Sequence, residues 1–196
     1  MKRNTIHLET KRLILRPFVL QDAEDIFQNW AADPEVTRFL SWRPHQTVEV
    51  TKAVINSWQK DYRGSGRCHW GIVWKETGGL VGNIAVVESG RDWAELGYCL
   101  GRAYWGQGIV TEAARAVIDY LFSKTTLSSI RARHHPDNPA SGAVMRKAGM
   151  RFVKIEPNGG QLNTGEPHDA ALYSLDREEW AKKKEKATPI SFTSLL

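Results

Sequence analysis

A glycine-containing turn, Tyr104 to Gly108, holds the residues of this 196-residue chain best suited to bind a reactive ligand. A strand-like segment precedes the turn, and a helical pattern begins directly after it at Ile109. Glycine lets backbone N–H groups approach a ligand, and the first turn of a helix adds unpaired donors and a favourable dipole. Such an arrangement binds phosphate. The alternative is a tight strand–helix connection that uses glycine only for its shape.

Two other phosphate-binding patterns fail on residue type. A P-loop needs Gly-x4-Gly-Lys followed by Ser or Thr, and the glycine spacing of 101–106 fits, but Gln107 and Gly108 replace the lysine and the hydroxyl residue. A dinucleotide-binding turn needs a third glycine where this chain has Thr111, and an acidic residue roughly 20 positions further on. Residues 127–130 contain no acidic residue. Neither of these two kinds of site is expected.

Four short motifs together are specific. Glu95-Leu-Gly-Tyr98 precedes the turn, Thr111-Glu-Ala113 follows it, and Asn138-Pro-Ala-Ser141 with Lys147-Ala-Gly149 delimits a later helical segment. In this order and separation they resemble the GNAT acetyltransferase superfamily, and more closely its branch of ribosomal-protein N-terminal acetyltransferases (RimJ/RimL-like). Segments near both ends of the chain also match: Glu9–Arg16, Tyr173–Leu175 and Glu179-Trp180. The resemblance therefore covers nearly the whole chain.

The resemblance implies a single GNAT-type domain over residues 1–187, of mixed α/β fold. Its central sheet is mostly antiparallel, with two splayed parallel central strands and flanking helices. Acetyl-CoA is then the acetyl donor, and its pantetheine arm lies between the strand that ends at Leu100 and the strand 130–134. The implied cofactor-binding residues are Tyr98, Cys99, Leu100, Trp105, Gly106, Gln107, Gly108, Ile109, Val110, Thr111, Asn138 and Ser141.

The sequence departs from the family pattern at three positions. Val110 stands where Gly or Ala is common, so crowding is a concern there, and Met150 stands where Phe is frequent. Many members of the superfamily have a tyrosine at the position of Met145, and that tyrosine protonates the leaving thiol. Methionine cannot donate a proton. The usual proton donor of the superfamily is therefore not expected at this position.

Acetyl transfer from a thioester to an amine needs a neutral amine, a donor for the developing oxyanion and help for the departing thiolate. For the leaving group we select Ser141, although a first-turn hydroxyl often bonds only its own backbone. For the base we select Glu95, on the strand beside the thioester, although a strand carboxylate is as often an ion-pair partner. The backbone N–H of Cys99 or Leu100 is the candidate oxyanion donor, and the Cys99 thiol is interpreted as a packing group.

Hydrophobic patterning predicts the elements that position these residues. Strand patterns cover residues 13–16, 70–74, 80–87, 93–100, 130–134, 152–155 and 171–175. Helical patterns cover 22–30, 47–62, 109–122, 138–149 and 176–184, and a short helix is expected to start at Asp33-Pro34. Residues 156–167, with Asn158-Gly159-Gly160, are interpreted as a mobile loop of the kind that a lid needs. This loop and the helices of 22–62 are expected to select the amine.

Composition and charge exclude several other classes. The net charge is +5, but the cations are scattered, and the one dense run, 182–186, is typical of a solvated helix end. No nucleic-acid partner is therefore expected. No apolar stretch reaches the roughly 20 residues that span a bilayer, so we expect no membrane partner and a cytoplasmic protein. Cys68 and Cys99 suggest neither a disulfide framework nor a CxxC site, and His134-His135 has no third ligand at supporting spacing, so no metal is expected.

The predicted function is N-acetyl transfer from acetyl-CoA to a primary amine, and the branch suggests a protein N-terminal α-amine. One alternative is a small-molecule amine, an antibiotic or a peptide toxin as the acceptor. Another is a module that binds acetyl-CoA without turning it over. Residues 188–196 are expected to form a mobile tail, and its apolar residues Ile190, Phe192 and Leu195 leave a homodimer open.

Overall fold

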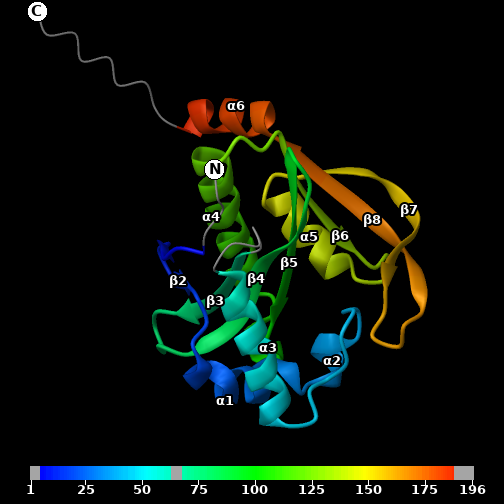
Figure 1. Ribbon diagram of the computed structural model, residues 1–196. Coiled ribbons are helices and arrows are strands. Elements are labelled where there is room, and N and C mark those ends of the chain that lie inside the picture. The colour runs from blue at the N-terminus through cyan, green and yellow to red at the C-terminus, as the bar shows by residue number, and fades with distance from the viewer. Residues whose placement is uncertain (1–4, 63–67, 188–196) are drawn as a thin grey trace, which may run out of the picture.

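The computed structural model describes residues 5–62 and 68–187, and the expected tail, 188–196, lies outside this range. Within it, one sheet runs in the order β1-β2-β3-β4-β5-β6-β8-β7 (Figure 1). All neighbouring strands are antiparallel except β5 and β6, so the predicted mostly antiparallel sheet with a central parallel pair is confirmed. The strands are β1 Leu8–Glu9, β2 Leu13–Arg16, β3 Cys68–Trp74, β4 Leu80–Ser89, β5 Trp93–Leu100, β6 Ser129–His134, β7 Arg151–Gln161 and β8 Pro167–Asp176.

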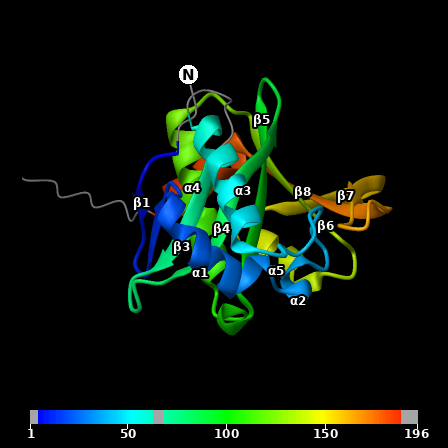
Figure 2. The ribbon, with the colours of Figure 1, turned by 60° about the horizontal axis from the view of Figure 1, so that its bottom comes forward.

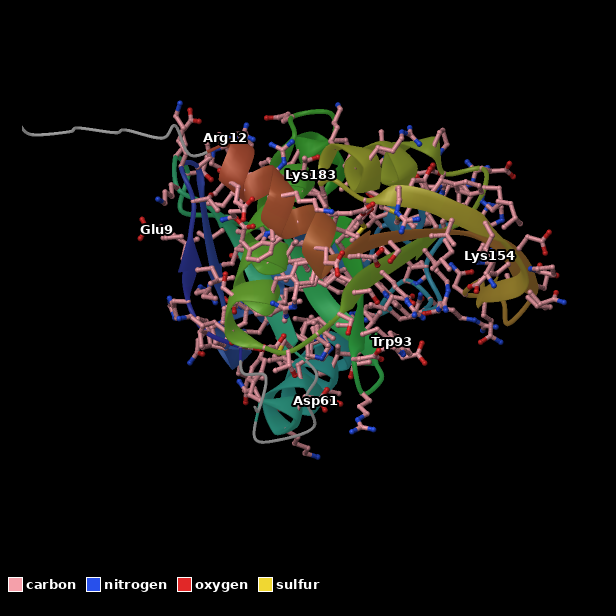
Figure 3. The ribbon with its side chains drawn as sticks, turned by 90° about the horizontal axis from the view of Figure 1, so that it is seen from above. Glu9, Arg12, Asp61, Trp93, Lys154 and Lys183 are labelled. Carbon is pink, nitrogen blue, oxygen red and sulfur yellow. The ribbon has the colours of Figure 1, made fainter. Side chains whose placement is uncertain are left out.

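Helices cover both faces of this sheet (Figures 1 and 2). They are α1 Ala23–Ile26, continued by a π-helical turn Phe27–Ala31, α2 Pro34–Thr37, α3 Val48–Asp61, α4 Ile109–Lys124, α5 Pro139–Lys147 and α6 Arg177–Ala187. The side chains of β3 separate two cores, because Trp70 and Ile72 pack with α4 while Val73 packs with α1 and α3. Figure 3 shows α6 on the side nearest the viewer, where Trp180 Nε1 donates to Asp119 Oδ1 of α4 at 2.6 Å.

The signals that mark helix ends in the sequence are realised in the structure. Asp33 Oδ1 accepts a hydrogen bond from the Glu35 amide at 2.9 Å, with Pro34 in the first helical position of α2. Asn138 Oδ1 accepts from the Ser141 amide at 3.2 Å in the same way at the start of α5. Both caps satisfy amides that the helix itself leaves unpaired. The cap of α5 therefore fixes where Ser141 stands.

The two parallel strands separate part-way along their length. β5 and β6 pair only from Trp93↔Ser129 to Leu96↔Ala132. Beyond this point β5 stays paired with β4 as far as Leu100, and β6 stays paired with β8 as far as His134. The backbone of residues 97–100 therefore lacks a strand partner on the β6 side. The predicted splay between these strands is confirmed, and it opens beside the glycine turn.

The mobile loop predicted for residues 156–167 is wrong. β7 continues to Gln161 and β8 begins at Pro167, so only a short turn remains between them, closed by the Leu162 amide donating to the Glu166 carbonyl at 2.9 Å. The register shifts between Glu156 and Gly160, and Asn158 adopts φ +52° in the intervening bulge. Proline and glycine here mark an irregularity inside a hairpin rather than its end, as they do elsewhere in strands.

Candidate active site

A cavity of about 440 Å³ opens where the strands separate. We call it the donor cavity. Its walls are the end of β5, the glycine turn and the first turns of α4 and α5. Of the residues for which the sequence predicted cofactor contact, all but Gln107 line it. Its lining also includes the cations Arg38 and Lys147 and one carboxylate, that of Glu35.

Unpaired backbone amides gather at one end of the donor cavity. Gly106 and Gly108 adopt φ +76° and +75°, a left-handed conformation that other residues rarely take. Within the described residues, no oxygen accepts a hydrogen bond from the amides of 106–111, and the first turn of α4 has no side-chain cap. Such a run of donors at a helix N-terminus fits an anionic group of phosphate type.

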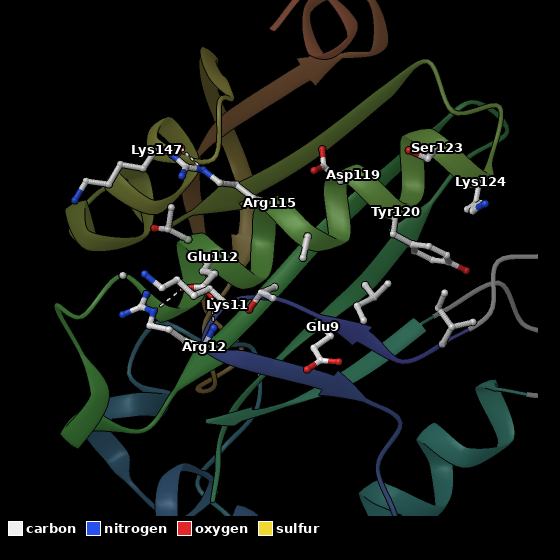
Figure 4. Close-up of a pocket in the computed structure, with 16 residues that line it drawn as sticks. Glu9, Lys11, Arg12, Glu112, Arg115, Asp119, Tyr120, Ser123, Lys124 and Lys147 are labelled. Carbon is white, nitrogen blue, oxygen red and sulfur yellow. Dashed lines mark hydrogen bonds and ion pairs between the residues drawn. The ribbon is translucent and has the colours of Figure 1, made fainter. Parts of the chain in front are cut away.

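A network of hydrogen bonds among Thr10, Arg12 and Glu112 supports the glycine turn, and its side chains lie in the groove drawn in Figure 4. Arg12 donates through Nη1 to the Gln107 carbonyl at 3.0 Å and through Nε to Glu112 Oε2 at 2.7 Å. Thr10 Oγ1 donates to Glu112 Oε1 at 2.6 Å. Burial raises the pKa of Glu112, but the hydrogen bonds from Thr10 and Arg12 outweigh it and leave that pKa below the usual value. Gln107 is therefore an anchor for the turn rather than part of the cavity wall.

This network lies in a groove of about 920 Å³ between β1 and α4, which Figure 4 shows. The groove shares Gly108, Thr111 and Lys147 with the donor cavity. Sequence reasoning missed the roles of Thr10, Arg12 and Glu112, although it matched the segments that contain them to a family. The sequence did contain a signal for these roles. Arg12 and Glu112 are charged residues inside segments that match the family, and charged residues of that kind which take no part in the chemistry are candidates for positioning the site.

A second cavity, of about 510 Å³, adjoins the first. We call it the acceptor cavity. The two share Phe39, Leu40, Tyr98 and Cys99, so they meet at the middle of the splayed part of β5. The walls of the acceptor cavity come from β3, β4, β5 and β6, the helical segment 26–31, α3, the segment after α2, and the β7–β8 hairpin. A group entering from each cavity would meet the other beside Tyr98 and Cys99.

Glu95 lines the acceptor cavity, and its side chain is nearly inaccessible, with the residue only 7% exposed. Burial raises the pKa of Glu95, and Glu88 and Glu156 raise it further, whereas Arg133 opposes them. Arg133 Nη1 lies 2.8 Å from Glu95 Oε2. That oxygen nevertheless accepts no well-directed hydrogen bond in the described part of the chain. Glu95 is thus an ion-pair partner and also a buried carboxylate with free acceptor capacity.

Ser141 lies in the donor cavity at the start of α5. Among the residues that the structure describes, its hydroxyl makes no hydrogen bond, so it is not the backbone-bonded hydroxyl that was the alternative. Tyr98 donates its phenol hydrogen to the Ser141 carbonyl at 3.0 Å, which fixes the first turn of α5 against β5. The hydroxyl of Ser141 remains available to a ligand in this cavity.

A family model described as an acetyltransferase (GNAT) domain matches residues 12–151. The chain belongs to the GNAT acetyltransferase family. It is an N-acetyltransferase, and among its relatives is the uncharacterized N-acetyltransferase p20 of Bacillus licheniformis, 37% identical over 179 residues, which cover 89% of this chain and 98% of p20. The predicted fold and reaction class are confirmed.

Two solved structures show the same fold as this acetyltransferase at low identity. The ribosomal L7/L12 α-N-protein acetyltransferase RimL, in complex with coenzyme A, has a TM-score of 0.77 at 20% identity, covering 87% of this chain and 98% of RimL. The microcin C7 self-immunity acetyltransferase MccE, in complex with acetyl-CoA and AMP, has a TM-score of 0.75 at 20% identity, covering 85% and 93%.

The departures from the family pattern have structural consequences in this acetyltransferase. Met145 is buried in the core under α5 and does not line either cavity. Val110 is packed in the same core.

Burial raises the pKa of the Cys99 thiol to about 12, and its Sγ lies 2.8 Å from Asn83 Oδ1, so the thiol is neutral and serves packing. Trp105 Nε1 donates to the Leu100 carbonyl at 2.8 Å, which ties the turn to β5.

The described residues contain neither a membrane-spanning helix nor a cluster of metal ligands. No helix in that part of the acetyltransferase is long and apolar enough to cross a membrane. No three histidine, cysteine, aspartate or glutamate side chains in residues 5–62 and 68–187 are grouped to hold a metal ion. His134 Nδ1 lies 2.7 Å from the His135 carbonyl, while its Nε2 is buried without a partner in the same range.

Proposed function

We propose that this acetyltransferase takes the acetyl group of acetyl-CoA in the donor cavity and passes it to a primary amine in the acceptor cavity. One observation carries the proposal: the unpaired amides of 106–111 stand at one end of the donor cavity, and its other end opens into the acceptor cavity at Tyr98 and Cys99. The complexes of RimL with coenzyme A and of MccE with acetyl-CoA support the choice of donor.

The residues present fit this donor, which supplies an activated acetyl thioester. The amides of 106–111 would hold its diphosphate. The backbone of 97–100, which has no strand partner on the β6 side, would pair with the amide groups of the pantetheine arm, with Asn138 near the thiol end. The amides of 106–111 make no hydrogen bond within the described residues, whereas the Leu100 carbonyl already accepts one from Trp105 Nε1 at 2.8 Å.

Three groups of the chain would carry the chemistry. Glu95 takes a proton from the incoming ammonium or amine, directly or through water. The backbone N–H of Cys99 or Leu100 polarises the acetyl carbonyl. The Ser141 hydroxyl hydrogen-bonds the sulfur as it leaves, because the usual tyrosine position is Met145 and buried. Each role needs a group on the cavity walls, and each of these groups lies there.

Thiol release tests the proposal against its alternative, a module that binds acetyl-CoA without turnover. The protein is incubated with acetyl-CoA alone and with a panel of primary amines, and free thiol and acetylated amine are both quantified. We expect multiple turnovers and one acetylated amine for each thiol released. Saturable binding of acetyl-CoA with no thiol release above the buffer rate for any amine would contradict the transferase role.

Gly108→Ala should weaken acetyl-CoA binding about 10-fold, because the αL conformation that aims the amides is lost. A Cβ at this position would meet only Arg12 Nη2, at 3.6 Å, so φ rather than space sets the cost. Gly78→Ala is the matched control, since Gly78 has φ +67° and open space in the β3–β4 turn. Both variants should lose about 1–2 kcal/mol of unfolding free energy in denaturant titrations, but calorimetry should show weaker binding only for Gly108→Ala.

Glu112→Gln should raise KM for acetyl-CoA about 10-fold, because the neutral amide holds Arg12 and Thr10 less firmly and the turn shifts. Glu9→Gln is the control: Glu9 lines the same groove but pairs with Lys75, at 2.6 Å, away from the turn. Steady-state kinetics check the pair. An equal effect of both substitutions would show that groove charge, rather than support of the turn, sets the affinity.

The names of the two structural relatives point to different acceptors. RimL is named for a ribosomal protein, which supports a protein N-terminus, and MccE is named for microcin self-immunity, which supports a non-ribosomal acceptor. Names therefore leave the acceptor class of this chain open. The acceptor class must instead be inferred from the walls of the acceptor cavity, because these walls contact the part of the acceptor that bears the amine.

A further inference from the structure

Two of the segments that line the acceptor cavity are joined by hydrogen bonds from residues just outside its lining. Arg43 Nε donates to the Asn163 carbonyl at 3.1 Å, and Asn163 Nδ2 donates to the Thr37 carbonyl at 3.0 Å. These bonds tie the tip of the β7–β8 hairpin to the end of α2 and to the segment after it, and Figures 1 and 2 both show the hairpin beside this segment. The rings of His135, which follows β6, and His168 of β8 lie 4.5 Å apart and join a second pair of segments that line the cavity. A polypeptide acceptor would need an open path between these walls for the rest of its chain.

Few charged side chains line the described part of the acceptor cavity. Glu95 and Arg133 are the only Asp, Glu, Lys or Arg residues among the described lining residues, and they pair at 2.8 Å. Arg133 also pairs with Glu156, at 2.7 Å, outside this lining. Burial lowers the pKa of His45 and His135, so both rings are neutral at pH 7. One ammonium group can be placed at Glu95. The described lining offers no second carboxylate, so a second ammonium buried on the same molecule would have no such partner there, which is unfavourable.

Aromatic and apolar side chains form much of the remaining described lining, beside Ser41, Asn83, Gln161 and five histidines. Trp30, Phe39, Trp42, Trp58 and Tyr98 contribute rings to the lining. Trp58 is held in place by stacking on His69, with ring centroids 5.2 Å apart, whereas Trp42 contacts only His45 among the ring pairs that the described residues form. Aromatic rings of this kind pack against planar or aliphatic groups of a ligand, and their faces attract cations.

From the joined wall segments, the few charges and the rings we infer that the acceptor is a small monoamine with an apolar, preferably aromatic, body. This inference rests on the proposed transferase function and names its substrate class. The amine points to Glu95, and the body packs against Trp42 and Phe39. Polyamines, aminoglycosides and protein N-termini are disfavoured, the first two by charge and the last by the joined wall segments.

Matched acceptors test the inference in the thiol-release assay with acetyl-CoA. 2-Phenylethylamine is compared with 1,5-diaminopentane, which is similar in length but carries a second ammonium, and with spermidine, kanamycin and a peptide with N-terminal alanine. We expect kcat/KM for 2-phenylethylamine to exceed that for each of the others by about 100-fold or more. A preference for a diamine, an aminoglycoside or the peptide would overturn the inference and leave the transferase function standing. Transfer to none of the amines would contradict the proposed function as well.

Substitutions at Trp42 give a second readout. Trp42→Ala should raise the KM for 2-phenylethylamine about 10-fold or more, while Trp42→Phe, which keeps a ring, should recover most of the affinity. Calorimetry with acetyl-CoA checks that both variants are folded and that the donor cavity is intact. Equal KM values for the amine in Trp42→Ala and the unsubstituted protein would show that this wall does not hold the acceptor, and would overturn the inference.

Discussion

Glu95→Gln is expected to lower kcat/KM for the amine by about 100-fold or more, with acetyl-CoA affinity unchanged. Glutamine keeps the size of the side chain but cannot accept the proton that the ammonium must lose. Glu95 lies on the wall of the acceptor cavity rather than the donor cavity, so donor binding should be unaffected. Steady-state kinetics with calorimetry for acetyl-CoA measure both quantities.

The pH profile separates a base from a structural carboxylate. Burial raises the pKa of Glu95 above the usual value of a glutamate. In the unsubstituted protein, log(kcat/KM) should therefore fall as the pH is lowered through this raised pKa, because the base becomes protonated. Glu95→Gln should lack this limb. Because the pKa of Glu95 is higher in the folded than in the unfolded protein, protonated Glu95 favours folding at low pH. This contribution to the free energy of unfolding is lost as the pH rises through the folded-state pKa, so at neutral pH the ionised carboxylate opposes folding. The neutral variant should therefore fold normally at pH 7.

Glu156→Gln is the control for Glu95→Gln. Glu156 Oε2 binds Arg133 Nε at 2.7 Å, so both carboxylates share one guanidinium, but Glu156 does not line the acceptor cavity. A substitution that merely disturbs Arg133 would affect both variants alike. Retention of kcat/KM and of the acid limb in a folded Glu95→Gln protein would remove Glu95 from the mechanism.

Ser141→Ala is expected to lower kcat about 100-fold, with little change in KM for acetyl-CoA. The hydroxyl makes no hydrogen bond among the described residues, so its loss should change the unfolding free energy by no more than about 0.5 kcal/mol. The fall in kcat would then reflect weaker support for the departing thiolate. Ser141→Thr, which keeps a hydroxyl at the same place, should recover much of the rate. Near-unchanged turnover in folded Ser141→Ala would exclude this role.

The backbone conformation of the glycine turn and the cap of α5 could be predicted from local sequence. Gly106 and Gly108 take the left-handed conformation that glycine permits, and Asn138 forms the cap that its residue type favours. These features depend on neighbours within a few positions. Hydrophobic periodicity likewise placed α4 and β5, because each buries one continuous stripe of side chains.

Contacts between distant segments were not accessible from the sequence. The anchor from Arg12 to the Gln107 carbonyl and the pair Glu95–Arg133 depend on strand order and register. The β7–β8 hairpin was misread because Pro157 and the glycines after it favour a loop locally, whereas pairing with β8 carries the strand through a bulge. Tertiary pairing overrides local preference most readily in strands.

The central claim is that the amides at the start of α4 bind the diphosphate of the donor, and amide NMR of the ¹⁵N-labelled protein tests it most directly. Saturation with coenzyme A should shift the resonances of residues 106–111 and of 97–100. Pantetheine, which lacks the diphosphate, should shift only those of 97–100. If coenzyme A saturates the protein and the amides of 106–111 do not move, the diphosphate binds elsewhere and the claim is wrong.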